Sequence, residues 1–330
     1  MIEGWGLSPT RDSTRAPRSN LEGYGYNSQI DTKRHQNMTA LLGGWQHYFV
    51  ETNQIRLHCV AQGEGDLVIL LHGFPEFWYS WRFQIPALAR HFKVVVPDLR
   101  GYNDSDKPEG GYDLDNLCAD IQGLIESFGY QRAHIVGHDW GGTIAWHLAQ
   151  KFPQCLDRLA ILNAAHPQRF LKEMVSNLDQ LRRSWYVLAF QIPGLPEWLI
   201  QQNLKEFVKN LFQGQAVRKG AFSQEETQVY QSALAKPGVL SAALNYYRQM
   251  LSPWNWIKDW DDTPRPIAVP TLILWGEEDS LLSSAYTQEL DQLITAPFQL
   301  QIIPNCGHWI QQEAPQTVNR ELLRFLRSTH

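Results

Sequence analysis

Short apolar runs alternate with helical patterns along most of this chain, and this alternation restricts the folds that it can adopt. Residues 66–73 and 92–101 contain continuous apolar runs, as strands buried on both faces do. Residues 114–129 form an amphipathic helical pattern. Residues 45–51 and 54–63 alternate polar and apolar side chains, which predicts two antiparallel strands joined by a tight turn. Strands that alternate with helices predict an α/β fold, with a mostly parallel sheet flanked by helices.

This pattern divides the chain into four parts. Residues 1–44 lack apolar periodicity and are rich in Gly, Ser, Asn and Arg, which predicts a disordered N-terminal extension. Residues 45–165 carry the first strands and helices of the α/β core. Residues 166–262 are helical and aromatic and interrupt the alternation after the sixth strand, which predicts an inserted helical cap. Residues 263–330 restore the strands, close with a helix and complete the core.

Composition and charge argue against several classes of partner. The chain has 330 residues, a net charge of −5 and no long basic run, so we expect no nucleic-acid partner. It shows no apolar run long enough to span a bilayer and no secretory signal pattern, so we expect no membrane partner and a cytoplasmic enzyme. Four scattered cysteines are interpreted as reduced thiols: Cys59, Cys118, Cys155 and Cys306.

The stretch from Gly137 to Gly141 has the form of a nucleophile turn with an unusual central residue. In the pattern Gly-x-Ser-x-Gly, a serine stands on a sharp turn between a strand and a helix. Here Asp139 occupies the central position. An aspartate is also a common N-cap of a helix, but a cap does not require Gly137, Gly141 and Gly142 around it. We therefore interpret Asp139 as a nucleophile.

An acid and a histidine follow two later strands. Asp279 comes after the apolar run "PTLILWG", and His308 comes after the last predicted strand. Glu277 and Glu278 are rival acids, but Asp279 lies furthest from its strand, where a loop can turn toward His308. Ligands bind beyond the carboxyl ends of strands in open α/β sheets. The chain order nucleophile, acid, histidine predicts a catalytic triad.

Backbone N–H groups near the turn are candidates for an oxyanion hole. Gly73 follows a predicted strand and permits an unusual backbone, so the N–H of Phe74 is one expected donor. The N–H of Trp140, one residue after Asp139, is the other. We expect structural roles for His72 and His138, because neither stands at a position expected to face the substrate. The histidines form no metal-ligand motif such as His-Glu-x-x-His, and no phosphate-binding glycine loop or dinucleotide motif is present, so we expect no metal and no cofactor.

The aspartate selects a class of reaction. A serine that attacked a saturated carbon would form an ether, which water could not release. An aspartate that attacks the same carbon forms an alkyl ester, whose carbonyl water can attack with His308 as the base. The amides of Phe74 and Trp140 would hold the oxyanion that develops. Epoxides and alkyl halides are the natural substrates of such displacement.

Four motifs resemble those of the epoxide hydrolase branch of the α/β-hydrolases: "HGFPEFWYSWR", "PDLRGYNDSDKP", "GHDWGG" and "NCGHW". The resemblance extends from about Trp45 to the C-terminal helix. It implies two tyrosines in the helical cap that hold and protonate the epoxide oxygen. "SWYVLAFQIPG" resembles the first stretch and gives Tyr186, and "LNYYRQM" resembles the second and gives Tyr247. In the second stretch Tyr246 replaces the usual tryptophan, so Tyr246 is a rival for the role.

Three alternative functions fit the sequence less well. "GHDWGG" also resembles haloalkane dehalogenases, which often carry a halide-binding Asn where this chain has Phe74. Fluoroacetate dehalogenases place arginines beside the nucleophile, where this chain has Trp140 and Gly142. A non-catalytic ligand-binding relative would not need the set Asp139, Asp279 and His308. We therefore expect a small lipophilic epoxide and water as the reactants.

The aperiodic extension generates the first prediction. A chain that begins at Met38 should keep full activity and the same melting temperature. The removed residues are polar and have little apolar surface to bury against the core. Diol formation and a thermal melt of the two chains measure both quantities. A large loss in either would show that residues before Met38 pack against the core or act in function.

Overall fold

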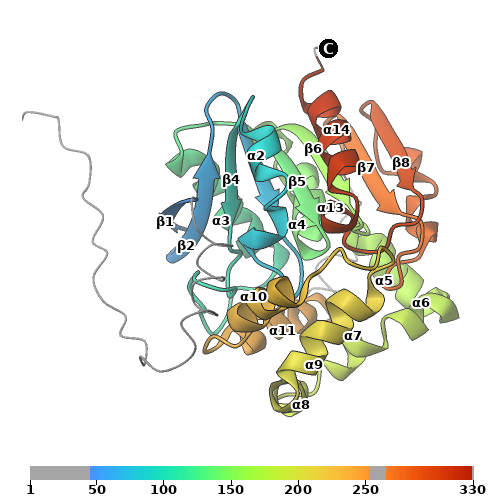
Figure 1. Cartoon of the computed structure of the whole chain (residues 1–330). Helices are drawn as coiled ribbons and strands as arrows, with labels where there is room; N and C mark the ends of the chain where they lie inside the picture. The colour runs from blue at the N-terminus through green and yellow to red at the C-terminus, as the bar shows by residue number, and fades with distance from the viewer. Residues whose placement is uncertain (1–44, 253–264, 329–330) are drawn as a thin grey trace, which may run out of the picture.

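The computed structural model describes residues 45–252 and 265–328, and its centre is an eight-stranded sheet (Figure 1). The strand order across the sheet is β1-β2-β4-β3-β5-β6-β7-β8. The strands are β1 (Gln46–Thr52), β2 (Ile55–Gln62), β3 (Leu67–Leu71), β4 (Lys93–Pro97), β5 (Ala133–His138), β6 (Leu156–Leu162), β7 (Thr271–Gly276) and β8 (Phe298–Ile303). The alternation of apolar runs with helical patterns predicted a mainly parallel sheet, and this prediction is confirmed.

Strand direction follows the sequence patterns. β1 and β2 pair antiparallel, as do β2 and β4, and every further pair is parallel. The antiparallel pair predicted for residues 45–51 and 54–63 is therefore confirmed. β3, β4 and β5 are buried along almost their whole length, because Val, Ile and Leu meet a packed layer on each face. The carboxyl ends of the parallel strands consequently lie along one edge of the sheet.

Helices cover both faces of the sheet (Figure 1). α3 (Leu114–Ser127) and α4 (Trp140–Lys151) lie behind the sheet in this view, and α2 (Ile85–Leu88), α13 (Ile310–Glu313) and α14 (Pro315–Leu326) lie in front. Asp113 is the N-cap of α3, and its side chain accepts a hydrogen bond from the backbone N–H of Asn116. Leu117, Ile121 and Leu124 recur at helical spacing and form its buried face. Short 3-10 turns connect these elements at η1 (Trp78–Trp81), η2 (Pro153–Cys155), η4 (Ser284–Thr287) and η5 (Leu290–Gln292).

A run of helices separates β6 from β7 and lies together at the carboxyl ends of the strands (Figure 1). We refer to α5–α11, residues 167–250, as the helical segment. Its elements are α5 (Pro167–Ser176), α6 (Leu178–Arg183), α7 (Trp185–Ala189), α8 (Leu195–Gln202), α9 (Leu204–Lys209), η3 (Asn210–Gly214), α10 (Gln224–Leu234) and α11 (Val239–Met250). Between 167 and 250 the structure contains no strand. The expected boundary at 262 and the predicted extension 1–44 lie outside the described residues.

Buried polar bonds attach the helical segment to the loops beneath it. The Tyr246 hydroxyl donates to the carbonyl of Arg100 at 2.7 Å, and the Tyr230 hydroxyl donates to Oε1 of Gln312 at 2.7 Å. Arg82 forms an ion pair of 2.6 Å with Glu226. In each of these three contacts a group of the helical segment bonds to a group of the α/β part of the chain, which fixes the segment over the edge of the sheet.

Two general expectations can be compared with the structure. All four cysteines are buried and none forms a disulfide, in agreement with reduced thiols. Within the described ranges, no helix combines the length and the apolar character needed to cross a bilayer.

The close approach of α4 to the sheet generates the second prediction. A Cβ atom at Gly141 would overlap the backbone carbonyls of Leu71 and His72, which cannot move aside as a flexible side chain can. Gly141→Ala should therefore lower the free energy of unfolding by about 1–3 kcal/mol. Gly110→Ala is the control, since a Cβ there has no heavy atom within 4 Å. A chemical denaturation series in which both variants match the parent would contradict the prediction.

Candidate active site

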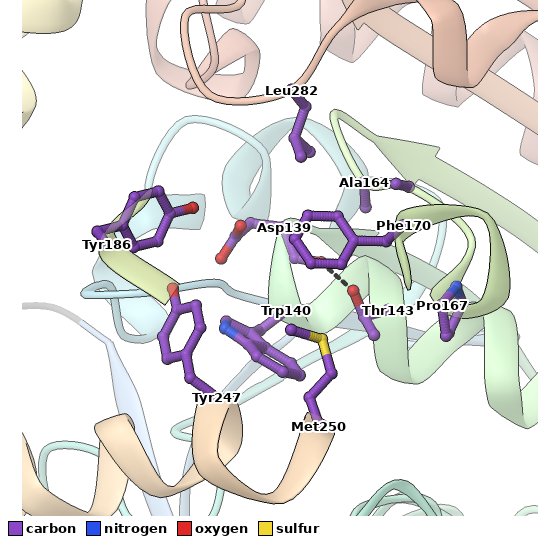
Figure 2. A pocket seen from close by; sticks show the side chains of 11 residues that line it. Asp139, Trp140, Thr143, Ala164, Pro167, Phe170, Tyr186, Tyr247, Met250 and Leu282 are labelled. Carbon is purple, nitrogen blue, oxygen red and sulfur yellow. Dashed lines mark hydrogen bonds between the residues drawn. The ribbon is translucent and has the colours of Figure 1, made fainter. Parts of the chain in front are cut away.

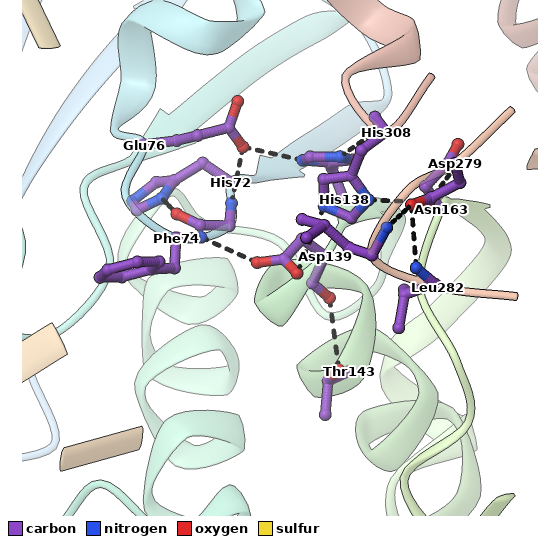
Figure 3. A network of polar contacts seen from close by, with 12 residues as sticks. His72, Phe74, Glu76, His138, Asp139, Thr143, Asn163, Asp279, Leu282 and His308 are labelled. Atoms are coloured by element: carbon purple, nitrogen blue, oxygen red, sulfur yellow. Dashed lines mark hydrogen bonds and ion pairs between the residues drawn. The ribbon is translucent and has the colours of Figure 1, made fainter. Parts of the chain in front are cut away.

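Asp139 stands on a sharp turn between β5 and α4. Its backbone has φ 50° and ψ −119°, a region that residues other than glycine rarely adopt and that tight packing must hold. A Cβ at Gly137 would overlap the carbonyl of Gly141, so the strand and the helix can approach only without side chains there. The turn lifts the Asp139 carboxylate above the edge of the sheet, where its Oδ1 accepts a hydrogen bond of 2.8 Å from the N–H of Phe74 (Figure 3).

His308 lies between two carboxylates. Its Nδ1 is 2.8 Å from Oδ2 of Asp279, and its Nε2 is 3.5 Å from Oδ2 of Asp139 (Figure 3). The first distance is a hydrogen bond, in which Nδ1 donates because an ionised carboxylate only accepts. The second is an electrostatic contact longer than a normal hydrogen bond. The structure thus brings together the three residues that the sequence predicted from different strand ends.

The Asp279 carboxylate is fixed by further donors. The backbone N–H groups of Leu281 and Leu282 donate to Oδ1 at 2.8 and 2.9 Å, and the Asn163 side chain donates to Oδ2 at 2.6 Å. Only 6% of Asp279 is exposed, whereas the rival acids Glu277 and Glu278 are exposed. Asp279 is therefore the acid that the structure places against His308.

Opposite charges set the protonation states of this group. Burial alone would raise the pKa of Asp279 and of Asp139, but contacts with His308 and with backbone amides outweigh it and hold both pKa values below their usual range. Burial alone would lower the pKa of His308, but the two carboxylates raise it to about 10. At neutral pH the group thus contains two carboxylates and one imidazolium.

The predicted oxyanion donors flank the same carboxylate. Phe74 follows β3 and already donates its N–H to Asp139. Trp140 is the first residue of α4, directly after Asp139. The first backbone N–H groups of a helix have no partner within the helix and are free to bind developing negative charge.

His72 and His138 are both buried and hydrogen-bonded. His72 Nδ1 is 2.9 Å from the carbonyl of Gly73, and its Nε2 accepts from the N–H of Leu99. Because a carbonyl only accepts, Nδ1 carries the single proton and the ring is neutral. Burial accordingly lowers the pKa of His72, against smaller opposing effects of nearby acids.

His138 differs from His72 in the number of ring nitrogens that donate. Its Nε2 is 2.9 Å from the carbonyl of His308 and must donate to it, and its Nδ1 is 2.8 Å from Oε2 of Glu76. Burial would raise the pKa of Glu76, but His138 and the Gly73 amide hold it below its usual value. With Glu76 ionised, both ring nitrogens of His138 donate, and this buried pair holds the backbone of His308 in place.

Two cavities meet at Asp139. A small pocket of about 40 Å³ and a larger cavity of about 810 Å³ share Asp139, Tyr186 and Tyr247 in their walls. The two phenol rings come from α7 and α11, with centroids 5.9 Å apart, and their hydroxyls point into the space beside the carboxylate (Figure 2). Burial raises the pKa of both phenols, and the Asp139 charge adds to the effect, so both remain protonated at neutral pH.

Tyr246 is separated from this space. It is fully buried, its hydroxyl donates to the carbonyl of Arg100, and it lines neither cavity. Adjacent residues on a helix point about 100° apart, so only one of the pair can face the carboxylate. The structure places Tyr247 in the cavity wall and Tyr246 in the packing against the core.

The helical segment also contacts the loop that carries Asp279. Nη1 of Arg183 donates to the carbonyl of Asp279 at 2.9 Å. The side chain of Gln180 donates to the carbonyl of Leu281 at 3.1 Å and accepts from the N–H of Ser283 at 3.1 Å. α6 thus forms three hydrogen bonds with the acid-bearing loop.

One group of side chains has metal-like composition. His58, Asp98 and Asp104 place ligand atoms within 4.8 Å of one another. Hydrogen bonds account for the arrangement, since His58 Nδ1 lies 2.6 Å from Asp98, and Asp98 also accepts from the N–H of Trp78. The group lies outside both cavity walls at Asp139.

Sequence reasoning missed Asn163 and Glu76. Asn163 directly follows β6, and a polar residue at the carboxyl end of a parallel strand is a signal that could have identified it. Its amide bridges two loops, donating to Asp279 and accepting from the N–H of Gly276 at 3.1 Å. Glu76 contacts Gln311 and Gln312, which lie more than 230 residues away, and gives no comparable local signal.

Known proteins with similar sequences and structures support this picture. The α/β hydrolase fold family matches residues 66–315. Epoxide hydrolase 3 of Xenopus tropicalis is 38% identical over 86% of this chain and 78% of its own length. Epoxide hydrolase 4 of Mus musculus is 37% identical over 87% of this chain and 80% of its own length.

Solved structures agree with these relatives. Epoxide hydrolase A from Mycobacterium thermoresistibile has a TM-score of 0.77 and 29% identity, covering 87% of this chain and 99% of that one. An epoxide hydrolase from Bacillus megaterium in complex with an inhibitor has a TM-score of 0.73 and 28% identity, covering 85% and 100%. This chain therefore belongs to the α/β-hydrolase fold family and, within it, to the epoxide hydrolase branch.

Proposed function

We propose that this protein hydrolyses lipophilic epoxides to vicinal diols through an alkyl ester on Asp139, with the helical segment as the cap of the active site. One observation carries the proposal most directly. A carboxylate, rather than a hydroxyl, stands on the turn after β5 and faces two phenols across an apolar cavity. The names of the relatives support the same activity, because several of them are epoxide hydrolases.

The first half-reaction uses Asp139 and the two tyrosines. Oδ1 of Asp139 is already bonded to the Phe74 amide, which leaves Oδ2 as the freer oxygen for attack on a ring carbon of the epoxide. The ring C–O bond breaks, and the oxygen gains a proton from Tyr186 or Tyr247. A phenol suits this step, because it donates a hydrogen bond to the ring oxygen and then a proton to the alkoxide. The product is a hydroxyalkyl ester of Asp139.

The second half-reaction uses His308 and water. Neutral His308 takes a proton from a water molecule, which attacks Cγ of the Asp139 ester, and Asp279 stabilises the imidazolium that forms. The N–H groups of Phe74 and Trp140 hold the oxyanion at the former carbonyl oxygen. When the C–O bond of the ester breaks, the departing alkoxide takes the second proton of the attacking water and leaves as the diol, and the oxygen of that water remains in the Asp139 carboxylate.

The charges of the site change in step with these half-reactions. Two carboxylates hold the pKa of His308 at about 10, so the free protein carries an imidazolium. Formation of the ester removes the charge of Asp139, and the pKa of His308 falls because one of its two negative neighbours is lost. The proton that His308 then releases restores the phenol that gave its proton to the epoxide oxygen. His308 becomes a base only after the ester exists.

The role of Asp139 generates the third prediction. His308→Gln should stop at the ester, because a carboxylate needs no base to attack but the ester needs one to hydrolyse. Mixed with a styrene oxide-type epoxide, this variant should gain the mass of the substrate on the peptide that contains Asp139. Intact-mass and peptide mass spectrometry measure the adduct, and Asp139→Ala is the control that should gain none and form no diol.

A labelling experiment separates this pathway from direct attack by water. In one turnover of the parent protein in heavy-oxygen water, the label should enter Asp139 and the diol should leave unlabelled. Label in the diol would mean that water attacks the epoxide and that Asp139 is at most a general base. Halide release from 1-haloalkanes or fluoroacetate without diol formation from epoxides would instead identify a dehalogenase.

The cavity tyrosines generate the fourth prediction. Tyr186→Phe and Tyr247→Phe should each slow ring opening by about tenfold or more, and the double variant by at least about a hundredfold, since each removes a proton donor. Single-turnover formation of the ester measures this step. Tyr246→Phe is the matched control, because it removes a buried hydroxyl outside the cavity. A damaged Tyr246→Phe beside an unaffected Tyr247→Phe would show that the assignment is off by one residue.

A further inference from the structure

The helical segment exposes an unusual number of large apolar side chains. Of the thirteen exposed large apolar side chains in the described residues, seven lie between 178 and 199. Exposed apolar residues are normally scattered singly, and a concentrated patch marks an interaction site. We define the apolar face by six of them, listed with their exposed fractions: Trp185 (67%), Leu188 (49%), Ile192 (49%), Leu195 (44%), Trp198 (57%) and Leu199 (51%).

Helical spacing accounts for this face. Leu195, Trp198 and Leu199 stand at positions i, i+3 and i+4 of α8, and Trp185 and Leu188 stand at i and i+3 of α7. Each set forms one stripe along its helix, and this stripe is exposed to solvent. An amphipathic helix in a core would turn such a stripe inward.

The apolar face borders the opening of the large cavity. Trp185 and Leu199 are exposed and also line the cavity of about 810 Å³ that reaches Asp139. A side chain that is both exposed and part of a cavity wall lies where that cavity meets solvent. Arg182 is exposed and lines the same cavity, so a cation stands beside the apolar rim.

Charge is distributed unevenly along the chain. Residues 167–220 contain eight Lys and Arg against four Asp and Glu, while the other 276 residues contain 21 against 30. The part of the chain that carries the apolar face is therefore net positive in a net negative protein. A net positive segment with exposed Trp, Leu and Ile is complementary to the anionic headgroups and apolar interior of a phospholipid bilayer.

We propose that the apolar face docks this protein onto the surface of an anionic phospholipid bilayer, with the opening of the cavity toward the lipid. Trp185 and Trp198 would lie at the level of the headgroups, where amphipathic rings are favoured. Leu188, Ile192, Leu195 and Leu199 would enter the boundary of the acyl chains. This contact is with the membrane surface, needs no spanning helix, and revises the sequence-based expectation of no membrane partner.

A second copy of the chain fits the face less well. A two-fold contact through this face would place one net positive segment against another, which like-charge repulsion opposes. It would also bury Trp185 and Leu199 and close the cavity that they border. A bilayer presents opposite charge and leaves the cavity in contact with the phase that dissolves lipophilic molecules.

Docking itself does not depend on the reaction at Asp139, whereas its consequence for substrate supply rests on the proposed function. A lipophilic epoxide partitions into the bilayer because burial of its apolar surface is favourable. At the docked face it could pass from lipid to the cavity without crossing water. The substrate class would then be epoxides that are carried in membranes.

Vesicle sedimentation tests the proposal. The full chain should sediment with phosphatidylcholine vesicles that contain about 30% phosphatidylglycerol, several-fold less with phosphatidylcholine alone, and less as salt rises. The double variant Leu188→Gln/Trp198→Gln should bind these vesicles at least about tenfold more weakly, because it removes two exposed apolar side chains. Neither side chain lines the cavity. Phe49→Gln is the control, because Phe49 is 55% exposed on β1 and lies outside the helical segment.

The outcomes separate the alternatives. Parent protein that stays in the supernatant at every lipid concentration, or a double variant that binds like the parent, would overturn the proposal. So would a lipid-independent dimer that the double variant abolishes in sedimentation velocity, because the occupant would then be a second copy. Diol formation from a water-soluble epoxide should be equal in parent and double variant. Absence of diol in both would count against the proposed function and leave the vesicle result unaffected.

Discussion

Three carboxylates and two imidazoles meet at the carboxyl edge of the sheet, and their charges must balance. Glu76 and Asp279 are buried, and Asp139 is exposed only toward the cavities that it lines. An unpaired carboxylate in such surroundings would carry a large desolvation cost. His138 and His308 supply the compensating charge, and backbone amides supply the remaining donors. Glu76, Asp279 and His308 follow β3, β7 and β8, while His138 and Asp139 both stand at the end of β5. The group therefore exists only when these four strands stand in their observed order.

This dependence explains which parts of the site could be predicted from the sequence. Asp139, Asp279 and His308 follow apolar runs, and the carboxyl ends of parallel strands share one edge, so strand assignment alone was enough to bring them together. The fold could be predicted for a similar reason, because the apolar runs and helical patterns are local. Most contacts of Glu76 are not local: its partner Gln312 is 236 residues away, and no periodicity in the sequence records that contact.

The pair Tyr246 and Tyr247 shows a different limit. The sequence identified the helix and the stretch that carries the two tyrosines. Which side of that helix faces the core, here called its phase, depends on packing. The bond from the Tyr246 hydroxyl to the Arg100 carbonyl and the packing of its ring against Tyr102 and Tyr112 set that phase. Tyr247 then faces Phe74, Trp140 and Tyr186, whose rings form the aromatic wall around the carboxylate.

The hydrogen bonds from α6 to the Asp279 loop have a consequence for how such proteins diversify. Gln180 and Arg183 belong to the part of the chain that shapes the cavity, yet they hold the loop that orients His308. If helical segments were exchanged between relatives to change the substrate range, the exchange would therefore also affect the loop that carries Asp279. A transplanted segment that lacks these two side chains would leave the acid-bearing loop less constrained, and recombination points placed after Arg183 would preserve the connection.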